Sequence, residues 1–244
     1  MKSTRLANPS LFVNIFLTTL AVLLAGCAGP TITMPELLEE PSVAVKPPEP
    51  PIITPKPDAD VAADITFDIF KANAALKRGD YAGAVKLFRS ELKEEQAKTE
   101  SSWVQLSYLN HQLGFALKHV ALHDEALEYY QKSLAIWLKQ LGSDHPRVIT
   151  SYNNIGEVYN KKGEYDKALE YHQKSLAIRL KQLGADHPDV AQSYNNIAVV
   201  YKAKKDLPKA KEYWGKAHAI LLKKLGPNHP HTKLVKGQLD ALKE

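Results

Sequence analysis

The sequence repeats itself with a period of 42 residues through much of its length. Three Leu-Gly pairs stand one period apart, at 141–142, 183–184 and 225–226. Two residues after each pair comes the same short junction, namely Asp144-His145-Pro146, Asp186-His187-Pro188 and Asn228-His229-Pro230. A constant period of this length is typical of a solenoid, in which neighbouring copies of one supersecondary unit bury each other's apolar faces.

Each copy contains two segments with helical spacing of apolar residues. In the copy at 143–184 these residues are Val148, Tyr152, Ile155 and Tyr159 in the first segment, and Leu169, His172, Leu176, Leu180 and Leu183 in the second. Spacings of three and four predict an amphipathic helix for each segment. Gly163 marks the end of the first helix, and Asp144 or His145 beside Pro146 supplies an N-cap and a first-turn proline. We therefore predict an all-α fold.

The copies resemble tetratricopeptide repeats, specifically the 42-residue variety of kinesin light chains. The resemblance lies in YNNIGEVY at 152–159, ALEYHQKSLAI at 168–178 and LGADHPDVA at 183–191. It implies a right-handed superhelical solenoid of helix pairs with a C-terminal capping helix. The small residues that this family places where two helices touch fall on Gly114, Gly156 and Ala198 in the first helices, and on Ala84, Ala126, Ala168 and Ala210 in the second.

Both ends of the repeat region depart from the pattern. Residues 59–100 keep Gly79 and Ala84 in register but lack the junction, so we interpret them as a divergent first repeat. The last copy has Pro208 in the first turn of a helix and Gly215 inside it. We predict a repeat domain at 59–244, with units at 59–100, 101–142, 143–184 and 185–226 and a cap at 227–244. The cap helix, from Thr232 to Lys243, should turn Leu234, Leu239 and Leu242 inward.

Residues 1–26 have the order of a secretory signal, with Lys2 and Arg5 before the apolar run 11–24. That run is shorter than the roughly 20 apolar residues that cross a bilayer. The sequence Leu24-Ala25-Gly26-Cys27 resembles the bacterial lipobox, which implies lipidation of Cys27, the only cysteine of the chain. The alternative is an ordinary signal peptide that contains a cysteine. Ala28, in place of an aspartate, favours the outer membrane, with the protein facing the periplasm.

Residues 27–58 are expected to be the lipidated cysteine followed by a linker. This segment holds nine of the 15 prolines, few aromatic residues and no helical period. Proline-rich chain tends toward an extended polyproline II conformation, which would hold the folded part away from the membrane. A docking role for residues 47–51 is the alternative.

The sequence favours no catalytic, cofactor or metal site. His145, His187 and His229 hold the same junction position in successive copies, so a role in the repeat explains them better than zinc does. The repeat register places a turn between His119 and His123, which separates those two rings. No phosphate loop or nucleophile motif is visible, so we predict no enzyme and no cofactor. Without Lys2 and Arg5 the net charge falls from +5 to near +3, which does not indicate nucleic-acid binding.

The resemblance implies that the first helix of each repeat lines a concave groove for a protein or peptide partner. The family pattern maps the groove onto His111, Phe115, Lys118, Asn153, Glu157, Asn160, Asn195, Val199 and Lys202. We predict that Asn153 and Asn195 hold the backbone of an extended peptide and that Lys118 and Lys202 meet its acidic groups. The alternative is that these asparagines bond between neighbouring helices. The predicted function is an envelope-anchored protein-interaction scaffold; a self-assembling structural lipoprotein of pilus, secretion or cell-wall machinery is the alternative.

Overall fold

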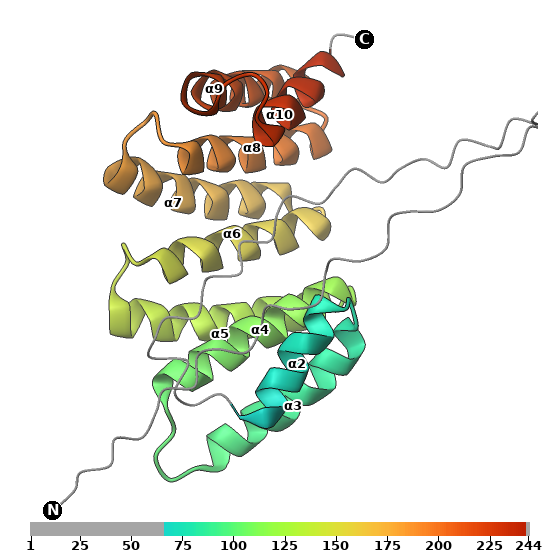
Figure 1. Cartoon of the computed structure of the whole chain (residues 1–244), viewed down its shortest axis with the longest axis vertical. Helices are drawn as coiled ribbons and strands as arrows, with labels where there is room; N and C mark the ends of the chain where they lie inside the picture. Colours follow the sequence, from blue (N-terminus) through green and yellow to red (C-terminus); the bar gives the residue numbers. More distant parts are fainter. Residues whose placement is uncertain (1–65, 243–244) are drawn as a thin grey trace, which may run out of the picture. The chain divides into compact units, whose positions relative to one another are not determined.

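The computed structural model describes residues 66–242, in which all regular structure is helical (Figure 1). The signal segment, Cys27 and the proline-rich linker lie outside the described residues. The helices are α2 (Phe67–Lys77), α3 (Tyr81–Ala97), α4 (Trp103–His119), α5 (His123–Leu141), α6 (Pro146–Lys161), α7 (Tyr165–Leu183), α8 (Pro188–Ala203), α9 (Leu207–Leu225) and α10 (Pro230–Asp240). The predicted all-α repeat fold is confirmed.

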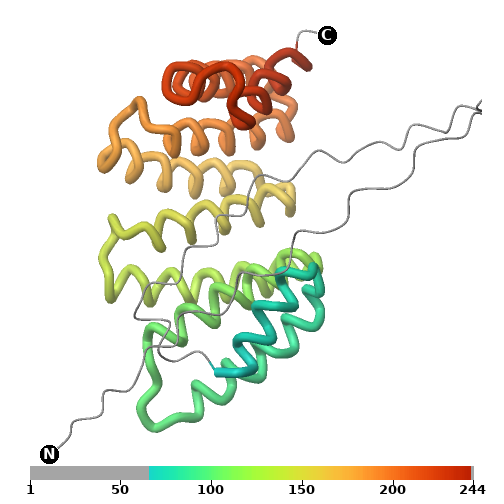
Figure 2. The backbone as a smooth tube through the Cα atoms, viewed as in Figure 1, coloured from blue at the N-terminus to red at the C-terminus, as the bar shows by residue number. Residues whose placement is uncertain are grey.

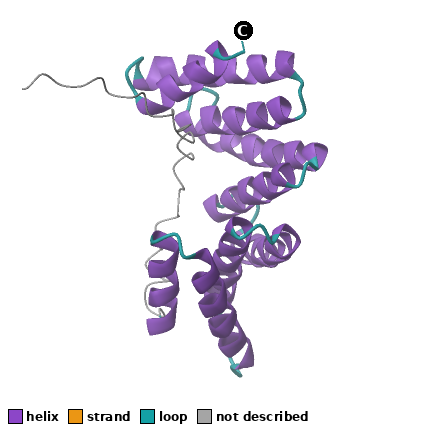
Figure 3. Ribbon diagram, turned by 90° about the vertical axis from the view of Figure 1, so that its right-hand side faces the viewer, coloured by secondary structure: helices purple, strands orange, loops and turns teal. Residues whose placement is uncertain are grey.

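Each helix packs on the helices before and after it in the sequence, so that the chain stacks in order from α2 to α10 (Figure 2). We call α2, α4, α6, α8 and α10 first helices and α3, α5, α7 and α9 second helices. Four complete pairs are followed by α10 alone. Figure 3 shows these elements joined by short loops. Within residues 66–242, no helix is both long enough and apolar enough to span a membrane.

The repeated histidine is a helix cap. The Nδ1 atoms of His145, His187 and His229 accept hydrogen bonds from the backbone N–H two residues later, at 3.2, 3.2 and 3.3 Å. Each histidine is followed by a proline in the first turn, where a missing N–H costs nothing. The sequence left Asp144 and His145 as alternatives for the cap, and the structure assigns the role to the histidine.

Small residues allow the two helices of a pair to approach closely, as predicted. A Cβ atom on Gly156 would lie 2.9 Å from the His172 ring, and one on Gly114 would lie 3.0 Å from the Tyr130 ring. These rings are almost fully buried. In these two pairs the glycine therefore leaves room for a ring of the second helix, whereas the last pair has Ala198 and Trp214 at the equivalent positions, both fully buried.

The turn between the two helices of a pair needs one residue with positive φ. Gly79 and Gly163 fill this position with φ of 78°, but Ala121 and Lys205 fill it in the other two pairs, with φ of 61° and 64°. The left-handed region is unfavourable for residues with a Cβ atom. The turn geometry is thus kept even where glycine is absent.

The C-terminal helix ends earlier than predicted, and its most deeply buried residues are not the predicted leucines. It ends at Asp240, and its fully buried residues are Thr232 and Val235 rather than a leucine stripe. Leu239 and Leu242 pack against the core, as predicted. Leu234 is only partly buried, because the face toward α9 follows the register of the earlier first helices, in which its position is not a core position.

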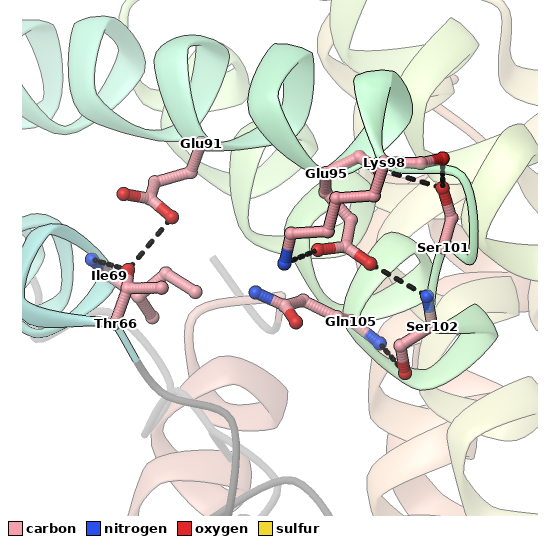
Figure 4. Close-up of polar contacts among 8 residues, drawn as sticks. All are labelled: Thr66, Ile69, Glu91, Glu95, Lys98, Ser101, Ser102 and Gln105. Carbon is pink, nitrogen blue, oxygen red and sulfur yellow. Dashed lines mark hydrogen bonds and ion pairs between the residues drawn. The ribbon is translucent and has the colours of Figure 1, made fainter.

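Two buried carboxylates of α3 accept hydrogen bonds at the starts of α2 and α4 (Figure 4). Glu91 accepts a hydrogen bond from the Thr66 hydroxyl at 2.8 Å, and Thr66 also caps α2. Glu95, 2% exposed, accepts from the backbone N–H of Ser102 at 2.7 Å and pairs with Lys98 at 2.6 Å. Since Ser102 caps α4, the carboxylate fixes the start of the second pair.

Candidate protein-binding face

The first helices lie beside one another, and their polar side chains meet between repeats. Lys118 of α4 donates to Glu157 of α6 at 2.8 Å, and Lys202 of α8 donates to Gln238 of α10 at 3.3 Å. Between α4 and α6, the His111 Nε2 and Asn154 Nδ2 atoms are 3.3 Å apart. We call this side of the molecule the first-helix face. All nine residues predicted for the groove belong to α4, α6 and α8.

Three of those nine residues turn inward, toward the second helix of their own pair. The Asn195 amide oxygen accepts a hydrogen bond from the Trp214 indole N–H at 2.9 Å, and the Asn153 oxygen lies 3.5 Å from Nδ1 of His172. Both amide oxygens therefore face a ring of the neighbouring helix, which agrees with the alternative expectation that these asparagines bond between helices. The physical reason is that a buried indole or imidazole needs a polar partner.

His111 occupies the same position one repeat earlier. Its ring is nearly buried and stands edge-on to the Tyr130 ring, with 5.3 Å between centroids. Burial lowers the pKa of both His111 and His172 to about 4. Both rings are consequently neutral at pH 7, and neither offers a positive charge to a partner.

Lys118, predicted to meet an acidic group of a partner, instead pairs with Glu157 of the neighbouring repeat. It is 5% exposed, its ammonium lies 5.0 Å from the centroid of the buried Phe115 ring, and it pairs with Glu157. A lysine desolvated in this way needs a carboxylate beside it. Glu157 keeps 45% of its side chain exposed, so it is the accessible half of the pair.

The remaining three predicted residues lie one repeat further along and combine an amide oxygen of Asn160, buried and unbonded within the described residues, with the exposed side chains of Val199 and Lys202. Asn160 and Val199 occupy the positions that Lys118 and Glu157 hold in the preceding repeat. Val199 is 40% exposed, and within the described residues the Asn160 amide oxygen has no hydrogen-bond partner. Lys202, one turn after Val199, is exposed. We call Asn160, Val199 and Lys202 the Val199 patch.

The sequence reasoning missed the second-helix rings as partners of the first-helix polar residues. Tyr130, His172 and Trp214 recur every 42 residues, each 19 residues after His111, Asn153 and Asn195. That paired recurrence was the available signal. Across residues 66–242, no three His, Cys, Asp or Glu side chains are grouped so as to hold a metal ion.

Comparison with protein families identifies the repeats. The model described as "Tetratricopeptide repeat" matches residues 105–181 and 148–223. No curated protein sequence matches the chain. Among solved structures, the nearly identical TPR-like repeats of a kinesin light chain-type protein from Podosopora anserina are 27% identical, with a TM-score of 0.62 over 72% of this chain and 83% of that chain.

Two further structures share the fold at lower identity. BtubC (BKLC) from P. vanneervenii is 22% identical, with a TM-score of 0.59 over 70% of this chain and 68% of that chain. A Rap protein complexed with competence and sporulation factor is 16% identical, with a TM-score of 0.57 over 75% of this chain and 51% of that chain. Residues 105–223 are therefore tetratricopeptide repeats, and the helical array is similar to the repeats of a kinesin light chain-type protein.

Proposed function

We propose that this scaffold binds a segment of a partner protein on its first-helix face, centred on the Val199 patch. The observation that carries the proposal is that an ion pair in one repeat is replaced in the next by an exposed valine and a buried amide oxygen without a hydrogen-bond partner among the described residues. Where Lys118 and Glu157 neutralise each other, Asn160 and Val199 leave an unsatisfied amide oxygen and an apolar side chain at equivalent positions. A buried polar atom without a hydrogen-bond partner calls for an explanation, and a bound partner segment supplies one.

The patch suits an extended segment with one apolar and one acidic side chain. A partner N–H would satisfy the Asn160 oxygen after rotation of the amide, and an apolar side chain would cover Val199. Lys202 would meet a carboxylate, since its present partner, Gln238, is neutral and 3.3 Å away. The Rap protein solved with competence and sporulation factor provides a precedent for a bound partner on this fold.

Selection from a displayed random-peptide library on the purified full chain tests the proposal. We expect selected peptides to carry an acidic residue near an apolar one. The double variant Val199→Glu, Lys202→Glu should weaken their binding at least about tenfold, because it removes the apolar contact and reverses the charge. Ala177→Glu, at an exposed site of α7, is the matched control and should leave binding unchanged. Peptides that bind both variants equally would contradict the proposal.

We further propose that a lipid on Cys27 anchors the scaffold to the bacterial envelope, on the periplasmic side of the outer membrane. Support comes from the lipobox-like residues 24–27 and the single cysteine of the chain. Two or more acyl chains give stable anchoring at about 0.8 kcal/mol per buried methylene. The Cys27→Ser variant should leave the membrane fraction and lose globomycin-sensitive processing. Unchanged fractionation and processing would refute the anchor.

A further inference from the structure

The two ends of the array differ in what they expose. At the C-terminal end, α10 carries a solvent-exposed ion pair between Lys236 and Asp240, at 2.9 Å. At the N-terminal end, Phe67 and Phe70 of α2 are 71% and 65% exposed, more than any other large apolar side chain of the described residues. One end is therefore polar and the other presents two aromatic rings.

The repeat register shows that Phe67 occupies a position that is buried in every later first helix. Its equivalents are Leu109, Ser151, Ser193 and Val235, which are all 3% exposed or less. In those helices the position is covered by the preceding second helix; the Ser193 hydroxyl, for example, accepts from Arg179 of α7 at 2.9 Å. Within residues 66–242 no helix precedes α2. The exposed surface of α2 thus corresponds to the interface between a second helix and the next first helix, which residues 66–242 form four times.

The charge of this surface indicates what would cover it. Lys71 occupies the position of Leu113, Ile155 and Ile197, each fully buried, yet it is exposed here. It lies 4.2 Å from the centroid of the Phe67 ring and pairs with Asp68 at 2.7 Å. Lys77 and Arg78, at the end of α2, are exposed as well. A covering helix would therefore need apolar side chains for the rings and acidic ones for the surrounding cations.

We propose that an acidic amphipathic helix of a partner protein packs on α2, in the place of a preceding second helix. Its apolar stripe covers Phe67 and Phe70, and its carboxylates face Lys71, Lys77 and Arg78. This surface is distinct from the Val199 patch. The scaffold would then hold two partner segments, one along the first-helix face and one at the N-terminal end of the array.

Two synthetic helical peptides of the length of α5 test this inference by fluorescence anisotropy with the full chain. Both carry leucines at helical spacing, one flanked by glutamates and the other by lysines at the same positions. We expect the glutamate peptide to bind at least about tenfold more tightly. Phe67→Glu, Phe70→Glu should reduce its affinity at least about tenfold, whereas Leu222→Glu, a control at an apolar residue of α9 that is 43% exposed, should not. Circular dichroism checks that each variant keeps its helices.

The other outcomes of these experiments show which molecule or segment occupies the α2 surface. Equal binding of both peptides, or no effect of the phenylalanine changes, would overturn the inference. A concentration-dependent dimer in sedimentation velocity that these changes abolish would replace the partner by a second copy. Binding only to a chain without residues 28–52 would assign the surface to the chain itself. The Val199→Glu, Lys202→Glu variant should bind the glutamate peptide like the wild type, so failure of the Val199 patch does not affect this test.

Discussion

The junction between α3 and α4 caps the following helix with different chemistry from the three later junctions. At the later junctions a histidine ring caps the first helix and a proline starts it. At the first junction the Ser102 hydroxyl accepts from the Gln105 N–H at 3.4 Å, and the buried Glu95 carboxylate accepts from the Ser102 N–H. The backbone donors at a helix start must be satisfied in either case.

The comparison shows that a divergent repeat can keep its structural role after its motif is lost. Glu95 occupies the position of Trp137, Arg179 and Leu221, and each of these second-helix residues is buried. Arg179 uses the position to bond Asp189 and Ser193 at the start of α8, as Glu95 does at the start of α4. At this position the first pair uses a buried carboxylate and the third pair a buried guanidinium, and each bonds the start of the following helix.

We expect acid to lower the stability of the repeats, because their buried histidines bind protons more readily once the chain unfolds. Folding lowers the pKa of His111 and His172 to about 4 from an unfolded value near 6.5. Between these values the unfolded state binds more protons, so stability falls as the pH drops from about 6.5 toward 4. The loss is about 3 kcal/mol for each ring. Urea unfolding at pH 7 and pH 4.5 measures it.

The chain supplies a matched control for the acid effect. His111→Asn copies Asn153, and His172→Tyr copies Tyr130, so the double variant places residues of neighbouring repeats at equivalent positions. It should unfold with a much smaller pH dependence. An undiminished loss of stability in this variant would place the acid-sensitive groups elsewhere, for example at the buried carboxylates of the first pair.

The next largest effect is expected at the first junction. Glu95→Leu gives this position the residue of the last repeat, Leu221, but leaves the Ser102 N–H without its acceptor. We expect a loss of about 2 kcal/mol in the free energy of unfolding, measured by urea denaturation. Glu94→Leu, at the exposed neighbouring position, controls for the added side chain. Equal losses of stability in the two variants would show that the Glu95 carboxylate does not stabilise this junction.

A later junction should be less sensitive. His187→Ala removes the ring that caps α8 and should cost about 1 kcal/mol, the usual value of an N-cap. His187→Ser should restore much of this loss, because a hydroxyl accepts the same kind of hydrogen bond. Thermal unfolding followed by circular dichroism distinguishes the two variants. A serine variant as unstable as the alanine variant would show that the ring acts by packing.

The smallest effect should be stabilising. Lys205→Gly relieves a positive φ that Gly79 and Gly163 adopt at the same position, and should add about 0.5–1 kcal/mol. Gly163→Ala is the reverse change and should lower stability by a similar amount. Melting temperatures measured side by side test both signs. A loss of stability in the glycine variant would mean that the Lys205 side chain contributes more than its backbone strain costs.

The sequence predicts the fold well because its signals are repeated. The junction histidines, the turn glycines and the small residues at helix crossings recur in register, so each copy supports the interpretation of the next. The site is harder to predict, because polarity alone does not say which way a helical residue points. Asn153 and Asn195 look like groove residues until His172 and Trp214 are seen to face them.

The same limit applies to charge. Lys118 is polar in the sequence but buried in the structure, since Phe115 and Glu157 enclose its ammonium. The Val199 patch arises because Asn160 and Val199 stand where Lys118 and Glu157 form an ion pair one repeat earlier. This difference becomes visible only when adjacent repeats are compared in three dimensions. The exposed rings of α2 likewise acquire meaning only through the equivalent buried positions of later helices.

Inward-facing polar residues of the first helices bond within the array, as Asn195 does with Trp214. A double-mutant cycle on Asn195 and Trp214 tests this bonding most directly, with unfolding free energies measured for Asn195→Ala, Trp214→Phe and the double variant. The hydrogen bond at 2.9 Å predicts a coupling energy of about 1 kcal/mol. A coupling energy of zero, with the two changes strictly additive, would contradict the claim and return Asn195 to the partner-binding surface.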